Sequence, residues 1–271
     1  MSALASQHNS ATQFFLLLFA LSIPFWIVDF NIDAKRSSLN FSVIDIITAF
    51  LPIITAFILT FQKQGKNGIK ILFFRIIDFA RIKKKGWFLV IIIMPFVIYF
   101  LIYYVLIFLD IALPADFKIP FSSIPTLFIL FFIGAVCEET GYMGYAFAPL
   151  YDKYNAFLAS LIIGFWWAIW HYPSIIQQQH NLYWIFWATL GTVAVRFLIV
   201  WIYQNTQQSL FACILFHAFM NLGRPLFPNN AYQNPLVDYP QIHYGLIAVI
   251  AIIIVVFSRN LFFAKSHNHI T

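Results

Sequence analysis

The sequence has little charge and almost no glutamate. Charged residues make up 10% of its 271 positions, whereas an ordinary soluble domain contains roughly 25%. Hydrophobic residues make up 62%. This composition excludes the soluble globular and disordered classes. The apolar runs are long enough to cross a bilayer, which takes about 20 residues in a helix.

Cysteine is scarce, and positive charge is confined to one region. Cys137 and Cys213 both fall within apolar runs, which favours two small buried side chains over a disulfide framework. The net charge of +6 is local, because eight of the sixteen Lys and Arg residues lie between Lys63 and Lys85. Such a cluster is typical of a cytoplasmic membrane surface. The expected partner is therefore the lipid bilayer, and binding to nucleic acid is not expected.

The fold class predicted is all-α: a polytopic membrane protein of about eight helices that enclose a polar cavity within the membrane. No repeat, low-complexity tract or long loop divides the chain, so residues 1–271 are expected to form a single membrane domain. The seventh predicted helix is short. The predicted spans are 12–30, 40–62, 87–113, 123–147, 157–178, 182–203, 209–224 and 241–258.

The basic segment 63–86 predicts the orientation in the membrane. It alternates basic and apolar residues at helical spacing, which we interpret as an amphipathic interfacial helix; a plain basic loop is the alternative. The positive-inside rule places it in the cytoplasm, and eight spans then put both termini there. Eleven Lys and Arg residues fall inside on this arrangement, and Arg196 lies within the sixth span. Four fall outside: Lys35, Arg36, Lys118 and Arg224.

Both glutamates of the chain lie in the fourth span, although ionisable groups inside a membrane are costly and usually functional. Glu138 shares a helix face with Gly134 and Gly141, small residues that let another backbone approach closely. Glu139 is rotated by about 100° and belongs to a different face. We therefore expect Glu138 to contact the substrate and Glu139 to support it.

Two further spans carry histidine. Trp167 and His171 in the fifth span are four residues apart, as are His217 and Asn221 in the seventh. Each pair therefore shares one helix face, which places an aromatic wall beside His171. The other histidines lie in tails or loops, where solvated or interfacial side chains are expected: His8, His180, His243, His267 and His269.

These polar groups suggest hydrolysis. Hydrogen bonds that merely join helices are the simpler interpretation, but a carboxylate, two imidazoles and an amide on three spans can do more. Glu138 and one histidine can deprotonate water, while the other histidine and Asn221 hydrogen-bond a developing oxyanion. Alternatively, Glu138, His171 and His217 can bind Zn²⁺ with one position open for water. Either arrangement hydrolyses an acyl bond.

In three ordered motifs the sequence resembles the CAAX protease and bacteriocin-processing (Abi) family of intramembrane proteases, in its prokaryotic branch. The first family motif is two glutamates, then arginine after three residues, commonly followed by glycine and an aromatic residue. The second is an aromatic residue with histidine four positions later, and the third is histidine with asparagine four positions later. The resemblance is strong over about 123–224. The matching residues are Glu138, Glu139, Gly144 and Tyr145, then Trp167 and His171, then His217 and Asn221.

The resemblance implies an eight-helix endopeptidase of a prokaryotic cell (inner) membrane. In it, Glu138 and His171 activate water, and His217 and Asn221 hold the oxyanion. Its substrate would be a membrane-associated or lipidated protein or peptide: eukaryotic relatives trim the last three residues of prenylated proteins, and prokaryotic ones are linked to bacteriocin maturation or immunity. The family is classed with metalloproteases, and dependence on zinc stays open.

The sequence departs from the family at Met143, which stands where the first motif has arginine. Glu139 thereby loses an intrahelical partner, and it is either protonated or paired with Arg196 or Arg224. We expect the neutral form. Arg224 is predicted at the outer edge of its span, and Arg196 near a cytoplasmic end from which a long side chain can snorkel to water.

Two other functions compete with hydrolysis. The Met143 departure allows a catalytically inactive relative that acts as a bacteriocin-immunity or chaperone-like membrane protein. A secondary transporter with Glu138 as proton carrier would show paired spans interrupted by Gly or Pro in two halves of the chain, and the sequence lacks that pattern.

Overall fold

The computed structural model describes residues 2–31, 43–119, 121–178, 180–230 and 232–264. Within these residues the chain is helical and contains no strand, which confirms the predicted all-α class. The described part has seven helices long and apolar enough to cross a membrane, and Leu210–Gly223 is a shorter apolar helix. The α-helices are α1 (Ser2–Asn31), α2 (Val43–Thr48), α3 (Leu51–Arg75), α4 (Gly86–Phe108), α5 (Ile124–Gly141), α6 (Phe147–Lys153), α7 (Ala156–Gln177), α8 (Leu182–Asn205), α9 (Leu210–Gly223), α10 (Pro235–Asp238), α11 (Pro240–Phe257) and α12 (Arg259–Phe263).

The last four predicted spans correspond to α7, α8, α9 and α11, with ends that differ by no more than two residues. The third span was predicted to reach 113, but α4 ends at Phe108, because Asp110 takes a positive φ of 54° that interrupts a helix. The fourth span continues from α5 through a π-helical turn, η3 (Tyr142–Ala146), into α6. Residues 40–42 of the second predicted span lie outside the described residues.

The basic segment 63–86 is helical only in its first half. α3 runs on to Arg75 through a kink at Gly65, where φ is 61° and ψ is −154°. Glycine adopts this backbone conformation without the steric cost that a Cβ brings. A short 3₁₀ turn, η1 (Phe79–Arg81), then precedes α4. The prediction of one amphipathic helix over the whole segment is therefore wrong beyond Arg75.

Asp78, between α3 and η1, fixes the start of α9. Its carboxylate accepts hydrogen bonds from the Ser209 hydroxyl at 2.7 Å and from the N–H groups of Leu210 and Phe211 at 3.2 and 3.1 Å. A carboxylate at a helix N-terminus accepts hydrogen bonds from the free N–H groups and interacts favourably with the helix dipole. The basic segment thus positions the helix that carries the third motif.

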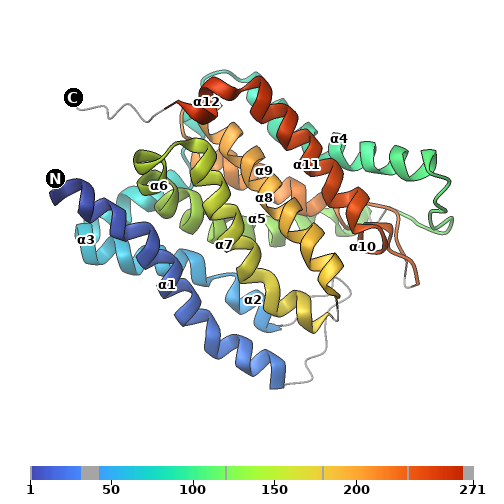
Figure 1. Cartoon of the computed structure of the whole chain (residues 1–271), viewed down its shortest axis with the longest axis horizontal. Helices are drawn as coiled ribbons and strands as arrows, with labels where there is room; N and C mark the ends of the chain where they lie inside the picture. Colours follow the sequence, from blue (N-terminus) through green and yellow to red (C-terminus); the bar gives the residue numbers. More distant parts are fainter. Residues whose placement is uncertain (1, 32–42, 120, 179, 231, 265–271) are drawn as a thin grey trace.

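The helices that carry the three motifs meet in the interior. α5 packs against α9, α7 packs against α8, and α8 also contacts α9, as Figure 1 shows in the middle of the bundle. Four ionisable side chains are buried where these helices meet: Glu138, Glu139, Arg196 and His217. The sequence predicted a polar cavity within the membrane. These residues make the interior polar where the helices meet, and a cavity around them stays a prediction.

The first part of α1 and the last helix, α12, lie near the same end of the bundle. Phe14 of α1 contacts Tyr145 of η3, with ring centroids 5.9 Å apart. α6 leads from η3 into α7, where Phe157 stacks on Phe263 of α12 at 4.8 Å. A chain that crosses the membrane an even number of times brings its two ends to the same side. That this end is cytoplasmic stays a prediction.

In intact cells, a membrane-impermeant maleimide should label Tyr232→Cys and leave Lys66→Cys unlabelled. Both native side chains are exposed, and the positive-inside rule places position 232 outside and position 66 inside. Cys137 and Cys213 are buried, so background labelling should be low. Both variants should react after permeabilisation. Labelling of Lys66→Cys alone in intact cells would mean that the orientation is inverted.

Candidate active site

Glu138 and Glu139 lie in the last turn of α5, directly before η3. Both are buried, with 9% of Glu138 and 0% of Glu139 exposed. Neighbouring helix residues point about 100° apart, and the two carboxylates accordingly contact different helices. Glu138 bonds to α7, whereas Glu139 bonds to α8 and α9.

The indole of Trp167 is the centre of the cluster. Its Nε1–H donates to Oε2 of Glu138 at 2.6 Å. Its ring meets the rings of His171 and His217 edge to face, with centroids 5.7 and 5.2 Å away. The structure thus brings three of the four predicted catalytic side chains against one tryptophan, which the sequence predicted only as a wall beside His171.

The hydrogen bonds indicate which nitrogen of each imidazole carries a proton. Nδ1 of His171 lies 2.8 Å from the backbone carbonyl of Trp167, and since a carbonyl only accepts, Nδ1 is the donor. Nε2 of a neutral His171 then has a free lone pair. Nδ1 of His217 lies 2.8 Å from Oε1 of Glu139 and donates to a carboxylate. Both rings therefore keep Nε2 for chemistry.

The prediction of a neutral Glu139 is wrong. Nη1 of Arg196 lies 2.6 Å from Oε2 of Glu139, and both side chains are fully buried. Arg196 does not snorkel to water, because its face of α8 packs closely against α7. Gly164 of α7 permits this close packing: a Cβ added at Gly164 would lie 3.2 Å from the Cβ of Arg196. A buried guanidinium needs a counter-charge, and Glu139 provides it. Arg224 is exposed at the end of α9.

Arg196 also covers the aromatic rings of the site. Its guanidinium carbon lies 4.4 Å from the centroid of Trp167 and 5.3 Å from that of Tyr142, within the range of attractive cation–π contacts. Arg196 therefore joins two halves of the cluster, since it pairs with Glu139 and lies over the indole that binds Glu138. Sequence reasoning weighed Arg196 as a partner of Glu139 but missed its contact with the rings of Trp167 and Tyr142.

Asn221 stands one turn beyond His217 on α9 and is half-buried. The two share a helix face, as their spacing predicted. The hydrogen bonds that join Glu138, Trp167 and His217 to their partners do not include Asn221. Its backbone carbonyl accepts from the N–H of Arg224 at 3.3 Å. The structure thus places Asn221 next to the cluster along α9 and not within its bonded core.

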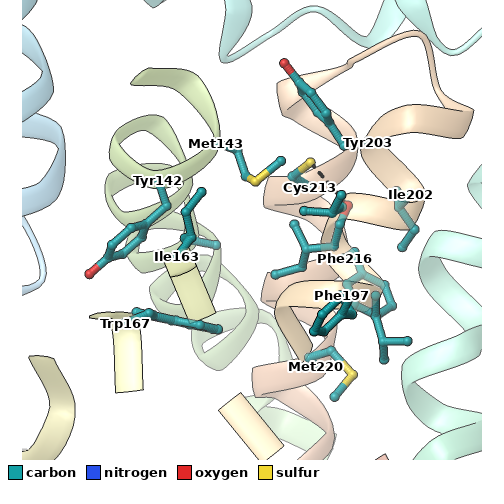
Figure 2. Packing of buried hydrophobic residues seen from close by; sticks show 14 of the residues in the cluster. Tyr142, Met143, Ile163, Trp167, Phe197, Ile202, Tyr203, Cys213, Phe216 and Met220 are labelled. Carbon is teal, nitrogen blue, oxygen red and sulfur yellow. Dashed lines mark hydrogen bonds between the residues drawn. The ribbon is translucent and has the colours of Figure 1, made fainter. Parts of the chain in front are cut away.

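Met143 is a packed core residue. It is fully buried in η3, and Figure 2 shows it pointing from η3 toward Cys213 of α9. The position that holds arginine in the motif is therefore filled by apolar packing. The positive charge beside Glu139 comes from α8 instead.

Glu138, His171 and His217, the residues predicted as possible zinc ligands, are not arranged around one point in the described part of the chain. Zn²⁺ would need Glu138, His171 and His217 to direct one atom each at a common point about 2.0–2.2 Å away. Among the described residues, no group of three His, Cys, Asp or Glu side chains is arranged to hold a metal ion. One Glu138 oxygen is instead bonded to Trp167. Metal dependence stays a prediction.

Comparison with known proteins agrees with the motifs. Residues 120–223 match the sequence model of a family described as "Type II CAAX prenyl endopeptidase Rce1-like". The chain is also 29% identical over 157 residues to "CAAX prenyl protease 2" of Methanococcus maripaludis, and the alignment covers 55% of this chain and 55% of the relative. The chain thus matches about half the length of this curated relative. These findings confirm the resemblance to the CAAX protease (Abi) family.

Proposed function

We propose that the chain is an intramembrane endopeptidase that hydrolyses a peptide bond of a membrane-associated or lipidated protein or peptide. The observation that carries this proposal is the gathering of Glu138, His171 and His217 around Trp167. The three groups come from α5, α7 and α9 and are brought together only by the fold. The matched family supports a protease function for the same region, 120–223.

Glu138 and His171 activate the water in the proposed reaction. One oxygen of Glu138 is held by the Trp167 N–H, which leaves the other to accept a proton. His171 offers Nε2, since its Nδ1–H is bonded to a carbonyl. As the water loses a proton to this pair, its oxygen attacks the scissile carbonyl. The C–N bond then breaks, and the proton passes to the leaving amine.

His217 and Asn221 stabilise the oxyanion in this proposal. Glu139 accepts from Nδ1 of His217, and a carboxylate in that position fixes the ring and stabilises an imidazolium, as in other carboxylate–histidine pairs. Nε2–H of the protonated ring and the amide N–H of Asn221 then donate to the oxyanion, where charge develops in the transition state. The two residues lie one turn apart on α9, which suits two donors to one oxygen.

A lipidated C-terminal peptide is the substrate class that the family description favours. The family is named for prenyl CAAX substrates, in which a C-terminal C-a-a-X sequence carries the lipid on cysteine. The lipid would partition into the bilayer that the seven long apolar helices cross. Delivery to a site between these helices then needs only lateral movement. The location proposed is a prokaryotic cell (inner) membrane.

A cleavage assay tests the proposal. Protein purified in detergent should release the terminal peptide from a farnesylated C-a-a-X peptide, and faster than from the same peptide without the lipid. The assay is repeated with a chelator, and equal rates would argue against a metal. A protein that cleaves neither peptide, nor a library of membrane-associated peptides, would favour the inactive immunity or chaperone-like alternative.

Asn221→Ala should lower kcat by about 10²- to 10³-fold, as loss of an oxyanion donor does, with a smaller change in KM. His217→Ala should act in the same direction. Asn205→Ala is the matched control, because Asn205 lies exposed at the end of α8 and should leave both constants unchanged. A rise in KM at constant kcat for Asn221→Ala would show that Asn221 binds substrate and does not stabilise the transition state.

A further inference from the structure

Glu139 uses each of its two oxygens for a different helix. Oε2 accepts from Nη1 of Arg196 on α8 at 2.6 Å, and Oε1 lies 2.8 Å from Nδ1 of His217 on α9. All three side chains are buried. The orientation of the His217 ring therefore depends on a carboxylate that is itself held by Arg196.

The guanidinium of Arg196 has few other attachments. Its Nε and Nη2 atoms are buried without a hydrogen-bond partner in the described part of the chain. Its face lies on the rings of Trp167 and Tyr142. An arginine can offer five N–H donors to its neighbours. Arg196 instead directs its one bond at the carboxylate that orients a proposed catalytic histidine.

The position four residues after Glu139 could supply the same charge from within one helical segment. Met143 occupies it, is fully buried, and lies in the π-helical turn that continues α5. Glutamate followed by a cation at this spacing is the favoured order for an intrahelical pair. The first motif has an arginine at this position. This chain has methionine there, and it carries a buried arginine on another helix, α8.

We propose that Arg196 is the positioning residue of the site: it holds Glu139 so that Glu139 fixes His217, and it does from α8 what an arginine at position 143 would do from η3. This inference rests on the proposed function for its kinetic effect. Its structural part, the dependence of His217 on Arg196, does not need an identified substrate.

Kinetics of three variants test the proposal. Arg196→Met should lower kcat about 100-fold or more, the scale seen when a catalytic histidine loses its orienting partner, with KM changed only a few fold. The double variant Met143→Arg/Arg196→Met should regain at least tenfold of that loss, because the charge returns beside Glu139. Met143→Arg alone should lower the melting temperature, because it adds a second buried cation near the first.

The matched control is Arg75→Met. Arg75 also ties a neighbouring helix to η3, through the Gly144 carbonyl at 3.0 Å, and it donates to the Tyr203 hydroxyl at 2.6 Å. It touches neither Glu139 nor His217 in these bonds. Arg75→Met should therefore lower the melting temperature and leave kcat of the folded protein unchanged. A merely structural Arg196 would behave in the same way as this control.

A readout without substrate separates this inference from the proposed function. In protein with ¹⁵N-labelled histidine, with His217 assigned by comparison with His217→Gln, the Nδ1 signal should report a proton bonded to a carboxylate. Arg196→Met should shift that signal, and the double variant should restore it. The wild-type protein could cleave no substrate while these shifts still occur. In that case the proposed function fails and the positioning role stands.

Three results would overturn the inference. The first is Arg196→Met with wild-type kcat in its folded fraction. The second is an unshifted His217 signal in that variant. The third is a folded double variant with no recovery of kcat or of the signal. If Arg196→Met does not fold, Arg196→Gln decides, because glutamine removes the charge and keeps a polar side chain: a kcat lowered tenfold or more supports the role, and an unchanged kcat contradicts it.

Discussion

Glu138→Gln should lower kcat for peptide hydrolysis by about 100-fold or more, the scale of a lost general base. The amide keeps the shape of the side chain and can still accept from the Trp167 N–H, a bond that is 2.6 Å long in the structure. It cannot take a proton from water. The fold should therefore survive while the chemistry fails, and the melting temperature should stay close to that of the wild type.

Asp152→Asn is the control for this change. It makes the same replacement of carboxylate by amide, but at an exposed position in α6, and it should leave the rate unchanged. Rates are measured on a farnesylated peptide under single-turnover conditions, so that product release does not mask the step. Comparable rates for Glu138→Gln and the wild type would remove Glu138 from the role of base.

Glu139→Gln should have the largest effect on stability. It leaves the guanidinium of Arg196 buried without its counter-charge, and breaking one side of a buried ion pair costs about 3–5 kcal/mol. For a chain of this size that corresponds to a fall in melting temperature on the order of 10 °C. Thermal unfolding in detergent, followed by circular dichroism or a thiol-reactive dye, measures it.

The double variant Glu139→Gln/Arg196→Met distinguishes the cause. Removing both charges should recover much of the lost stability, since replacing a whole buried pair by uncharged side chains is often neutral. Activity should not return, because His217 loses the carboxylate that fixes it. A Glu139→Gln melting temperature within a degree or two of the wild type would mean that Glu139 is already neutral, as the sequence alone had suggested.

The positions of most helices could be predicted from the sequence, because long apolar runs and their interruptions are local properties. The sequence was also sufficient for pairs on one helix: the i, i+4 spacing of His217 and Asn221 holds in α9. The convergence of Glu138, His171 and His217 depends on three helices. The spacing within each helix motivated the expectation that they act together, but it could not place one helix against another.

The partner of Glu139 could not be predicted from local properties. An arginine in an apolar run can snorkel to water or be buried, and which of these occurs depends on what its helix faces. Here Gly164 of α7 admits the α8 backbone, since a Cβ at that glycine would lie 2.9 Å from the Val193 Cα. Arg196 is thereby enclosed. The kink at Gly65 and the π-helical turn after α5 were missed because they change helix geometry without breaking the apolar pattern.

Hydrolysis in H₂¹⁸O is the most direct test of the central claim. Wild-type protein, incubated in detergent with a farnesylated C-a-a-X peptide, should yield a lipid-bearing product whose new carboxyl terminus carries one ¹⁸O, as mass spectrometry detects. Glu138→Gln should give this product about 100-fold more slowly or not at all. Labelled product formed equally fast by Glu138→Gln, or no cleavage by wild-type protein that is folded, would contradict a peptidase centred on Glu138.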